Sequence, residues 1–372
     1  MKTTALQFCL ALLGLSCLAP AAEAPARRVR PPAIVSPDIQ ADRHVTFRLQ
    51  APKATEVLVN GQWTDGRAPM TKGSNGVWSV TMGPIEPGVW EYSFQVDGLA
   101  MIDPGNPALK PMRAPRTSIL HLPGQPPLIH DFQDVPHGVV HQYTYRSQAL
   151  GRLRELVVYT PPGYDKQPDA RFPTLYLQHG SGDNQATWVA HGKAHWILDN
   201  LLAQGRAKAM VVVMMDGHAA TGGGAGGPTS NTALFERDLL EDVLPFVEAN
   251  YRVKTDAANR AIAGLSMGGG QALAIGLQHP DRFAWIGGFS SGLPDQDSLT
   301  GLLSQPEAAN EKLKLLWIAC GKDDFLLKRN LDFIALLTEK HIRHTWRPSE
   351  GAHSWPVWRG YLAEFVPLLF QP

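Results

Sequence analysis

A chain of 372 residues, of which 44% are apolar and 18% charged, has the composition of a globular protein and is long enough for two domains. Lys and Arg together number 34, as do Asp and Glu, so no net charge favours nucleic acid, an anionic membrane or a polyanionic ligand. We therefore expect a ligand that is recognised by shape, stacking and a few polar contacts.

The first 24 residues have the features of a signal peptide. Lys2 gives a positive start, and Ala5 to Leu18 is an apolar run too short to span a bilayer. Ala22-Glu23-Ala24 fits the small-x-small cleavage pattern. The sequence predicts an exported protein, periplasmic or secreted, without a membrane span. Lipoprotein anchoring at Cys17 is the less favoured alternative.

Cysteine and histidine spacing argues against a disulfide framework and against a metal site. Cys9 and Cys17 lie in the leader, so Cys320 is alone in the mature chain, after an apolar strand-like run that predicts a buried thiol. His191 and His195 stand four apart but lack the intervening Glu of a zinc protease. We expect neither a metal nor a cofactor.

Residues 30–123 have the pattern of a small β domain. Short runs of alternating or β-branched and aromatic residues occur at 45–49, 56–59, 78–82 and 90–96. Turn pairs such as Asn-Gly and Asp-Gly separate them. Short strands at this spacing predict a β-sandwich.

Five segments of this domain carry a resemblance: Arg48–Pro52, Gly61–Trp63, Gly76–Trp78, Tyr92–Phe94 and Asp103–Pro107. They resemble immunoglobulin-like modules of the family-48 carbohydrate-binding type, which precede glycan-active enzymes. In such modules exposed aromatic rings stack on sugars. Here we expect Trp78, Trp90, Tyr92 and Phe94 to be core and Trp63, beside a turn, to be the better candidate for exposure.

The sequence pattern indicates a linker at residues 124–141 and predicts an α/β domain at residues 142–372. The alternation of strand and helix patterns predicts a mostly parallel sheet covered by helices. The expected strands are 156–159, 174–177, 209–215, 260–263, 284–289 and 313–319, and the expected helices are 196–202, 235–247, 269–278 and 331–337.

Gly264-Leu265-Ser266-Met267-Gly268 is a Gly-x-Ser-x-Gly motif between an expected strand and an expected helix. That placement forces the serine into a strained turn that exposes its hydroxyl, and the following helix directs its positive end at a developing oxyanion. The motif therefore predicts that Ser266 is a catalytic nucleophile.

A nucleophilic serine needs a base downstream in this fold class. Four histidines follow Ser266. His353 lies in the loop after the last expected strand, where the base belongs, whereas the other three are expected at the surface. Those three are His279, His341 and His344.

The carboxylate that orients the base is expected after the strand that ends near residue 319. Asp323 and Asp324 both lie there, and resemblance to the usual position of the acid in this fold class favours Asp324. Asp295 and Asp297, after the preceding strand, are a second choice. Asp216 precedes the serine, which is the wrong order, and is expected to shape the pocket wall.

Two backbone amides are expected to form an oxyanion hole. Met267 N–H follows the nucleophile directly. The second donor is expected from the loop after an early strand, where Ser181 N–H is preferred and Gly180 is the alternative. The side chain of His179 is expected to hold that loop in shape.

Residues 142–372 as a whole resemble the esterase D-like α/β-hydrolases. They are most similar to carbohydrate esterase family 1, which includes feruloyl and acetylxylan esterases, and to siderophore trilactone esterases. The resemblance implies that Ser266, Asp324 and His353 are nucleophile, acid and base. One departure is Ala352, where the family often has a second glycine before the histidine. The matching segments are Tyr159–Tyr164, Leu177–Gly180, Asp183–Trp188, Phe235–Tyr251, Gly264–Gly269, Cys320–Asp324 and Gly351–Trp358.

The resemblance implies a serine ester hydrolase that releases feruloyl or acetyl groups from plant polysaccharide such as xylan. Trp188, Trp355 and Trp358 are candidates for binding the acyl ring or a sugar, or for a hydrophobic seam under the loops. A siderophore trilactone esterase is the alternative, although Lys322 and Lys328 are the only nearby cations for a catecholate. Acyl transfer to a sugar and a silent carbohydrate-binding protein on the same fold are further alternatives.

Overall fold

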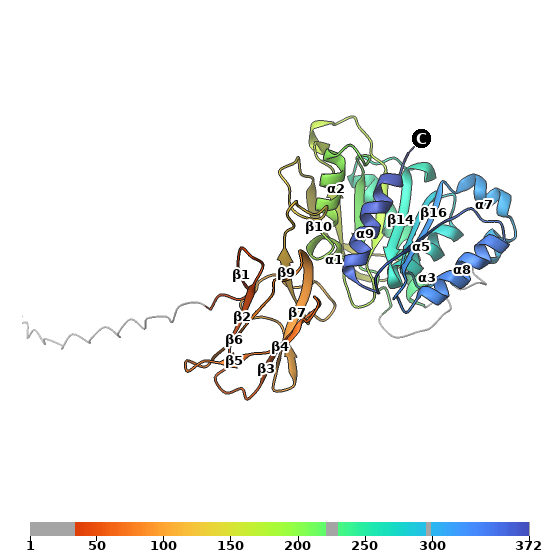
Figure 1. Cartoon of the computed structure of the whole chain (residues 1–372). Helices are drawn as coiled ribbons and strands as arrows, with labels where there is room; N and C mark the ends of the chain where they lie inside the picture. Colours follow the sequence, from red (N-terminus) through yellow and green to blue (C-terminus); the bar gives the residue numbers. More distant parts are fainter. Residues whose placement is uncertain (1–33, 221–229, 295–298, 372) are drawn as a thin grey trace, which may run out of the picture. The chain divides into compact units, whose positions relative to one another are not determined.

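A computed structural model describes residues 34–220, 230–294 and 299–371 (Figure 1). Val35–Pro372 form one compact unit, which is described here. The predicted signal peptide, with Cys9 and Cys17, lies outside the described residues, as do Asp295 and Asp297. Among the described residues, no helix is both long enough and apolar enough to cross a bilayer.

The N-terminal domain is a sandwich of two antiparallel sheets, as predicted (Figure 1). Alternate residues of both sheets meet in one apolar core, which includes Phe47, Trp78 and Phe94. The first sheet has the order β1 (Asp38–Ile39), β2 (Val45–Gln50), β6 (Val77–Met82), β5 (Thr71–Lys72). The second has the order β4 (Arg67–Pro69), β3 (Val57–Gly61), β7 (Gly88–Val96), β8 (Leu99–Met101), and β9 (Ser118–Leu122) also pairs with β7.

Trp63 lies in this core and not at the surface, so the expectation that it is exposed was wrong. Its ring is 6% exposed and stacks on Phe47, with 5.7 Å between centroids and 6° between planes. A Cβ on Gly61 would lie 2.2 Å from the indole. The glycine of the turn therefore gives the ring room to fold back over its own strand.

The C-terminal domain is built on an eight-stranded sheet. The order is β10 (Val139–Ser147), β11 (Arg152–Thr160), β13 (Val211–Met215), β12 (Thr174–Gln178), β14 (Arg260–Leu265), β15 (Trp285–Phe289), β16 (Leu315–Gly321), β17 (Thr345–Ser349). The six strands from β12 to β17 are parallel, and β10 and β11 are antiparallel. The parallel strands end at a common edge, and the loops that follow them meet there.

Helices cover both faces of this sheet because its central strands are apolar on both sides. In β12, for example, Tyr176 enters one core, and Leu175 and Leu177 enter the other. The first core packs on α3 (Asn231–Arg237), α4 (Leu244–Asn250), α5 (Ser266–Gln278), α7 (Pro306–Lys312) and α8 (Leu327–Glu339), and α6 (Thr300–Leu303) lies beside it (Figure 1). The second packs on α1 (Thr187–Ala190), α2 (Ala194–Ala203) and α9 (Trp355–Phe365).

The segment between the two domains, expected to be a linker, is packed against α2. Asn200 Nδ2 donates to the carbonyls of Ile129 and Asp131 at 2.8 and 2.9 Å. The Asp131 carboxylate accepts backbone N–H bonds from Gly124 and Leu128. Fixed contacts of this kind indicate that the segment joins the domains as an ordered element.

Candidate active site

Ser266 occupies a strained turn between β14 and α5. Its φ is +53°, a value that few residues other than glycine adopt. Strand and helix cross closely, since a Cβ on Gly264 would lie 2.5 Å from the Gly268 backbone. The glycines of the motif thus permit the crossing, and the serine hydroxyl is placed at the start of α5.

Three side chains from different loops form one hydrogen-bonded chain at the carboxyl edge of the sheet. His353 Nε2 lies 2.9 Å from Ser266 Oγ. His353 Nδ1 lies 2.9 Å from one carboxylate oxygen of Asp324 and 3.1 Å from the other. The structure therefore brings together the three residues that the sequence proposed as nucleophile, base and acid, with the spacing that proton transfer requires.

Asp324 is placed for this role by its surroundings. Its side chain is buried, and Leu326 N–H donates to Oδ1 at 2.8 Å. Burial alone would raise its pKa, but the hydrogen bonds from His353 and Leu326 lower the pKa below the ordinary value. Asp324 is thus an ionised acceptor for His353. Asp323 is exposed and lies outside the hydrogen-bonded chain described here.

Cys320, at the end of β16, is buried, as predicted. Burial and the neighbouring charge of Asp324 raise the pKa of its thiol to about 12. A thiol in this state is a poor nucleophile, so Cys320 packs under the site.

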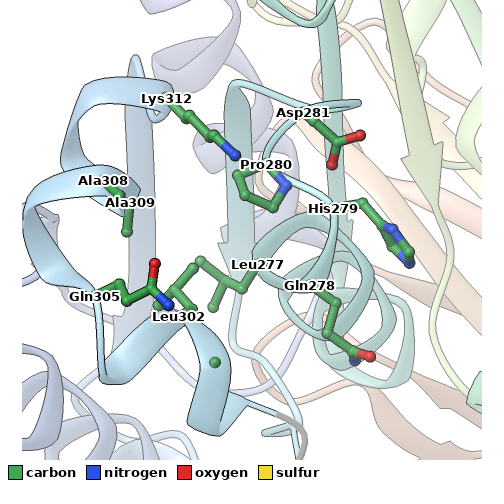
Figure 2. Close-up of a pocket in the computed structure, with 11 residues that line it drawn as sticks. Leu277, Gln278, His279, Pro280, Asp281, Leu302, Gln305, Ala308, Ala309 and Lys312 are labelled. Carbon is green, nitrogen blue, oxygen red and sulfur yellow. The ribbon is translucent and has the colours of Figure 1, made fainter.

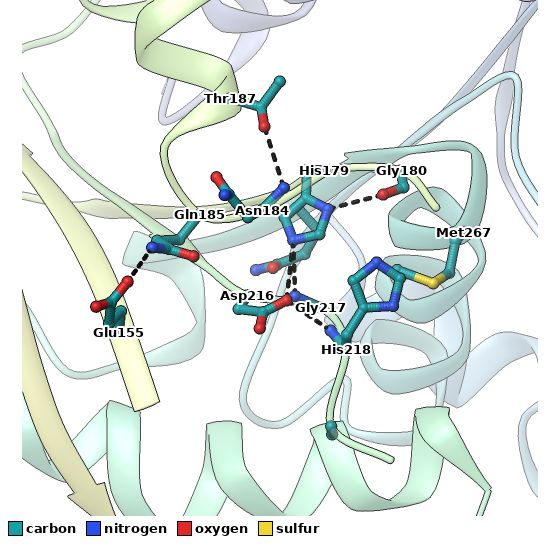
Figure 3. Close-up of polar contacts among 12 residues, drawn as sticks. Glu155, His179, Gly180, Asn184, Gln185, Thr187, Asp216, Gly217, His218 and Met267 are labelled. Atoms are coloured by element: carbon teal, nitrogen blue, oxygen red, sulfur yellow. Dashed lines mark hydrogen bonds and ion pairs between the residues drawn. The ribbon is translucent and has the colours of Figure 1, made fainter. Parts of the chain in front are cut away.

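The loop that follows β12, residues 179–183, is held by the ring of His179 (Figure 3). Nδ1 donates to the carbonyl oxygen of Gly180 at 2.8 Å, and Nε2 accepts from Gly217 N–H at 2.8 Å. These partners fix the ring as the neutral Nδ1–H tautomer. Asp183 N–H donates to the same Gly180 carbonyl at 3.3 Å.

The carbonyl of Gly180, which is bonded to His179, sets the direction of the Ser181 amide in the same peptide group. In a trans peptide the C=O and N–H groups point to opposite sides, so the Ser181 N–H is directed away from His179. A Cβ on Gly180 would lie 3.3 Å from Ser266 Cβ, which places this peptide against the serine. Met267 N–H belongs to the first turn of α5, where amides have no partner within the helix. Met267 N–H and Gly180, whose peptide group carries the Ser181 amide, thus lie beside Ser266.

The three tryptophans considered for substrate binding lie in the core, which corrects that interpretation. Trp188, Trp355 and Trp358 are 1%, 3% and 6% exposed. They pack edge to face in a row, and Trp188 Nε1 donates to Gln178 O at 2.9 Å. They form the hydrophobic seam under the loops, because α1 and α9 turn these side chains toward the sheet. Trp358 in turn supports the ring of His353 at 4.8 Å.

Phe325 is a candidate site residue that the sequence reasoning missed. Its ring is 75% exposed and lies 4.5 Å from the ring of His353, centroid to centroid. An exposed phenyl ring beside the base can stack on a substrate. Its position directly after Asp324 is the only signal in the sequence, because exposure of a loop aromatic has no sequence pattern.

A polar cavity of about 540 Å³ adjoins the 179–183 loop on the side of β13. His218 lies in its wall and accepts from Gly182 N–H at 3.2 Å. Burial lowers the pKa of His218 to about 4, so its ring is neutral near pH 7. The other polar lining residues are Arg113, Thr144, Arg152, Arg154, Glu155, Gln185 and Asp216.

A second cavity, of about 370 Å³, lies at the far end of α5 (Figure 2). It is lined by residues 277–281 and by α6 and α7. Since α5 has 13 residues and rises ~1.5 Å per residue, this cavity is about 20 Å from Ser266. His279 lies in its wall and contacts Glu236 at 2.7 Å, so it takes no part in the chain at Ser266.

The described part of the chain contains no group of three or more His, Cys, Asp or Glu side chains able to hold a metal ion. His191 is fully buried, and burial holds the pKa of its ring well below the ordinary value. His195 is half-buried beside Trp196, with 4.9 Å between the ring centroids. Both histidines are packing residues of α2 and the turn before it.

The mostly parallel sheet and the strained serine between β14 and α5 define an α/β-hydrolase. Within that class, a family model described as "Putative esterase" matches residues 147–369. The chain belongs to this esterase family.

This chain is also similar to several individual esterases. The "Endo-1,4-beta-xylanase/feruloyl esterase" of Xylanibacter ruminicola is 32% identical over 346 residues, which are 90% of this chain and 46% of that protein. The chain therefore spans less than half of that relative. A solved ferulic acid esterase is 27% identical, with a TM-score of 0.56 over 62% of this chain and 97% of its own. The enterobactin esterase of Shigella flexneri, at 21% identity, shares the fold, with a TM-score of 0.61 over 88% of this chain and 93% of its own.

Proposed function

We propose that this protein is a serine carboxylic ester hydrolase that releases feruloyl or acetyl groups from a plant cell-wall polysaccharide such as xylan. The observation that carries the proposal is the chain of hydrogen bonds from Ser266 through His353 to Asp324, in which each distance is 2.9 Å. The proposal is supported by membership of the esterase family and by the relatives named for feruloyl esterase activity.

The geometry supports a two-step acyl transfer. Ser266 Oγ attacks the ester carbonyl while its proton passes to His353 Nε2, and the negative oxygen is bound by the amides of Met267 and Ser181. The carbon–oxygen ester bond breaks, and His353 protonates the leaving alcohol. Water then attacks the acyl-enzyme, with His353 as base, and the carboxylic acid leaves while Ser266 regains its proton.

The order of the strands indicates on which side each half of the substrate lies. The 179–183 loop follows β12, and His353 follows β17, on the other side of Ser266. The leaving alcohol must face the histidine that protonates it, so the acyl group points toward β13 and the cavity of about 540 Å³. Gln185 and Glu155 in its wall offer hydrogen bonds to a phenol, and Phe325 beside His353 offers a face for the sugar of the alcohol.

Hydrolysis of a matched ester panel tests this function. Methyl ferulate, acetylated xylan, p-nitrophenyl acetate and a catecholate trilactone are offered to the wild type and to Ser266→Ala. We expect turnover of a feruloyl or acetyl ester that falls about 10³-fold or more in the variant. A wild type that is no faster than Ser266→Ala on every ester would overturn the proposal and favour a silent carbohydrate-binding protein.

Hydrolysis of a siderophore trilactone is the second candidate. The cavity wall carries Arg113, Arg152 and Arg154, and guanidinium groups bind catecholate oxygens. Arg152 and Arg154 already donate to backbone carbonyls of residues 216–219, which leaves the exposed Arg113 best placed for an anion. Faster turnover of the trilactone than of every feruloyl and acetyl ester would establish this candidate instead.

Two further properties belong to the proposal. The protein acts after export, and the β-sandwich assists in holding the polysaccharide. Of the aromatic residues in this domain, Trp90 is half-buried and the others are buried, so Trp90 is the ring best placed to contact a sugar. Pull-down of the protein with insoluble xylan, with Trp90→Ala as the comparison, tests the second property.

A further inference from the structure

A loop of the β-sandwich, residues 110–117, lies against the 179–183 loop of the catalytic domain, and it is called the docking loop here. Arg113 N–H donates to Gly182 O at 2.9 Å, and Met112 forms a β-bridge with Asp183. Thr187 Oγ1, just beyond the 179–183 loop, donates to Pro111 O at 2.6 Å. The two domains therefore share main-chain hydrogen bonds at the loop that presents the Ser181 amide.

One buried cation joins the side chains at this contact. Lys110 Nζ lies 3.0 Å from Asp183 Oδ1 and 3.0 Å from Glu91 Oε1. The three side chains are between 5% and 9% exposed, so water screens the attraction only weakly. Thr117, at the other end of the docking loop, donates to the second oxygen of Glu91 at 2.8 Å.

Removing one member of such a cluster leaves an unpaired charge in the interior. Burial raises the pKa of Asp183, and the nearby Lys110 opposes that rise. Without Lys110, Asp183 has either to take up a proton or to move toward water, and both changes act on the loop that it terminates. Asp183 N–H also holds the Gly180 carbonyl, whose peptide carries the Ser181 amide.

We propose that Lys110 of the β-sandwich is a positioning residue for the reaction: through Asp183 it holds the 179–183 loop so that the Ser181 amide faces the oxyanion at Ser266. This inference rests on the proposed ester hydrolysis. It means that the sandwich forms part of the catalytic apparatus in addition to any role in holding substrate. A shift of 1 Å in such a loop is enough to weaken an oxyanion hydrogen bond strongly.

Lys110→Met, which keeps the unbranched stem of the side chain and removes the charged ammonium group, is the first variant. Its kcat for methyl ferulate is expected to fall about tenfold or more, while KM changes by less than about twofold. Phenylboronic acid forms a tetrahedral adduct on the serine and so reports on the oxyanion site directly. Its inhibition constant should rise by about the same factor as kcat falls, whereas inhibition by free ferulate should not change. A purely structural role would not lower kcat and boronate affinity together while KM and inhibition by ferulate stay unchanged.

The double variant Lys110→Met/Asp183→Asn removes both charges. Its loss of kcat should be smaller than the sum of the single losses on a free-energy scale, because no unpaired charge remains on the 179–183 loop and Glu91 keeps its hydrogen bond from Thr117. Arg48→Met is the matched control, since Arg48 pairs with Asp38 at 3.0 Å within the same sandwich, away from the docking loop. It should keep the kcat of the wild type.

Thermal unfolding shows first that each variant is folded at the assay temperature. If Lys110→Met does not fold, Asp183→Asn, which removes the ion pair at the 179–183 loop and leaves Lys110 paired with Glu91, decides with the same measurements. A folded variant whose kcat and boronate affinity both stay within about twofold of the wild type overturns the inference and leaves the ester hydrolase intact. A wild type without Ser266-dependent turnover overturns the proposed function itself.

Discussion

Asp323 and Asp324 are neighbours in the chain but have opposite surroundings: Asp324 is buried and bonded to His353, whereas Asp323 is exposed. Asp324→Asn is therefore expected to lower kcat by about 10⁴-fold, because the amide cannot hold the imidazole in the working tautomer. Asp323→Asn serves as the matched control and should keep kcat within about twofold. Steady-state kinetics on methyl ferulate measure both, and equal losses in the two variants would contradict the assignment.

The same carboxylate makes stability depend on pH. Its pKa in the folded chain is lowered from the ordinary 3.8, so the unfolded chain binds its proton more readily in acid. The resulting stabilisation is fully present above about pH 4 to 5 and is lost as the pH falls through the lower, folded-state pKa. Urea unfolding at several pH values should show the wild type more stable than Asp324→Asn at pH 6. A difference that stays constant down to pH 2.5 would contradict this.

Phe325→Ala should weaken substrate binding with little effect on folding. The ring is exposed and packs mainly on His353, so we expect an unchanged midpoint of thermal unfolding. For a feruloylated xylo-oligosaccharide KM should rise about fivefold or more, since a stacked sugar contributes about 1 kcal/mol or more. Methyl ferulate, which lacks the sugar, is the control substrate and should show a smaller change. Equal changes for both substrates would place the ring against the acyl group instead.

Trp188→Phe should show the opposite pattern. The change removes the indole N–H that donates to Gln178 O and leaves that carbonyl buried without its partner. The free energy of unfolding should fall by about 1–3 kcal/mol, measured by urea denaturation. KM for methyl ferulate should stay within about twofold of the wild type, because the indole is 1% exposed. A selective rise in KM without loss of stability would return Trp188 to the substrate site.

Much of the fold could be predicted because its signals are local. Apolar runs followed by helical periodicity indicated the parallel sheet, and the motif around Ser266 marked the turn from strand to helix. The carboxyl edge of a parallel sheet collects the loops after its strands, so the loops that carry Asp324 and His353 could be placed near Ser266 from chain order. The choice of Asp324 over Asp323 depended on resemblance to the usual acid position of the fold.

What could not be predicted depends on contacts between distant segments. A tryptophan in a loop or at the start of a helix has the same sequence signature whether it is buried or exposed. Trp63 and the three seam tryptophans were therefore candidates for binding, although the structure buries them. The pairing of Lys110 with Asp183 joins two domains, and no periodicity in either segment predicts this ion pair. Such contacts depend on tertiary packing, which local patterns do not encode.

The reactivity of the buried Cys320 can report on local opening of the central sheet. Burial raises the pKa of its thiol to about 12, so the thiol stays protonated near pH 8, and the side chain is fully covered. Alkylation of Cys320 therefore requires β16 to separate from its neighbours, and its rate, followed by peptide mapping, measures how often the centre of the sheet opens. The strand that carries this thiol also leads into Asp324, so the same rate describes how long the catalytic arrangement persists between openings.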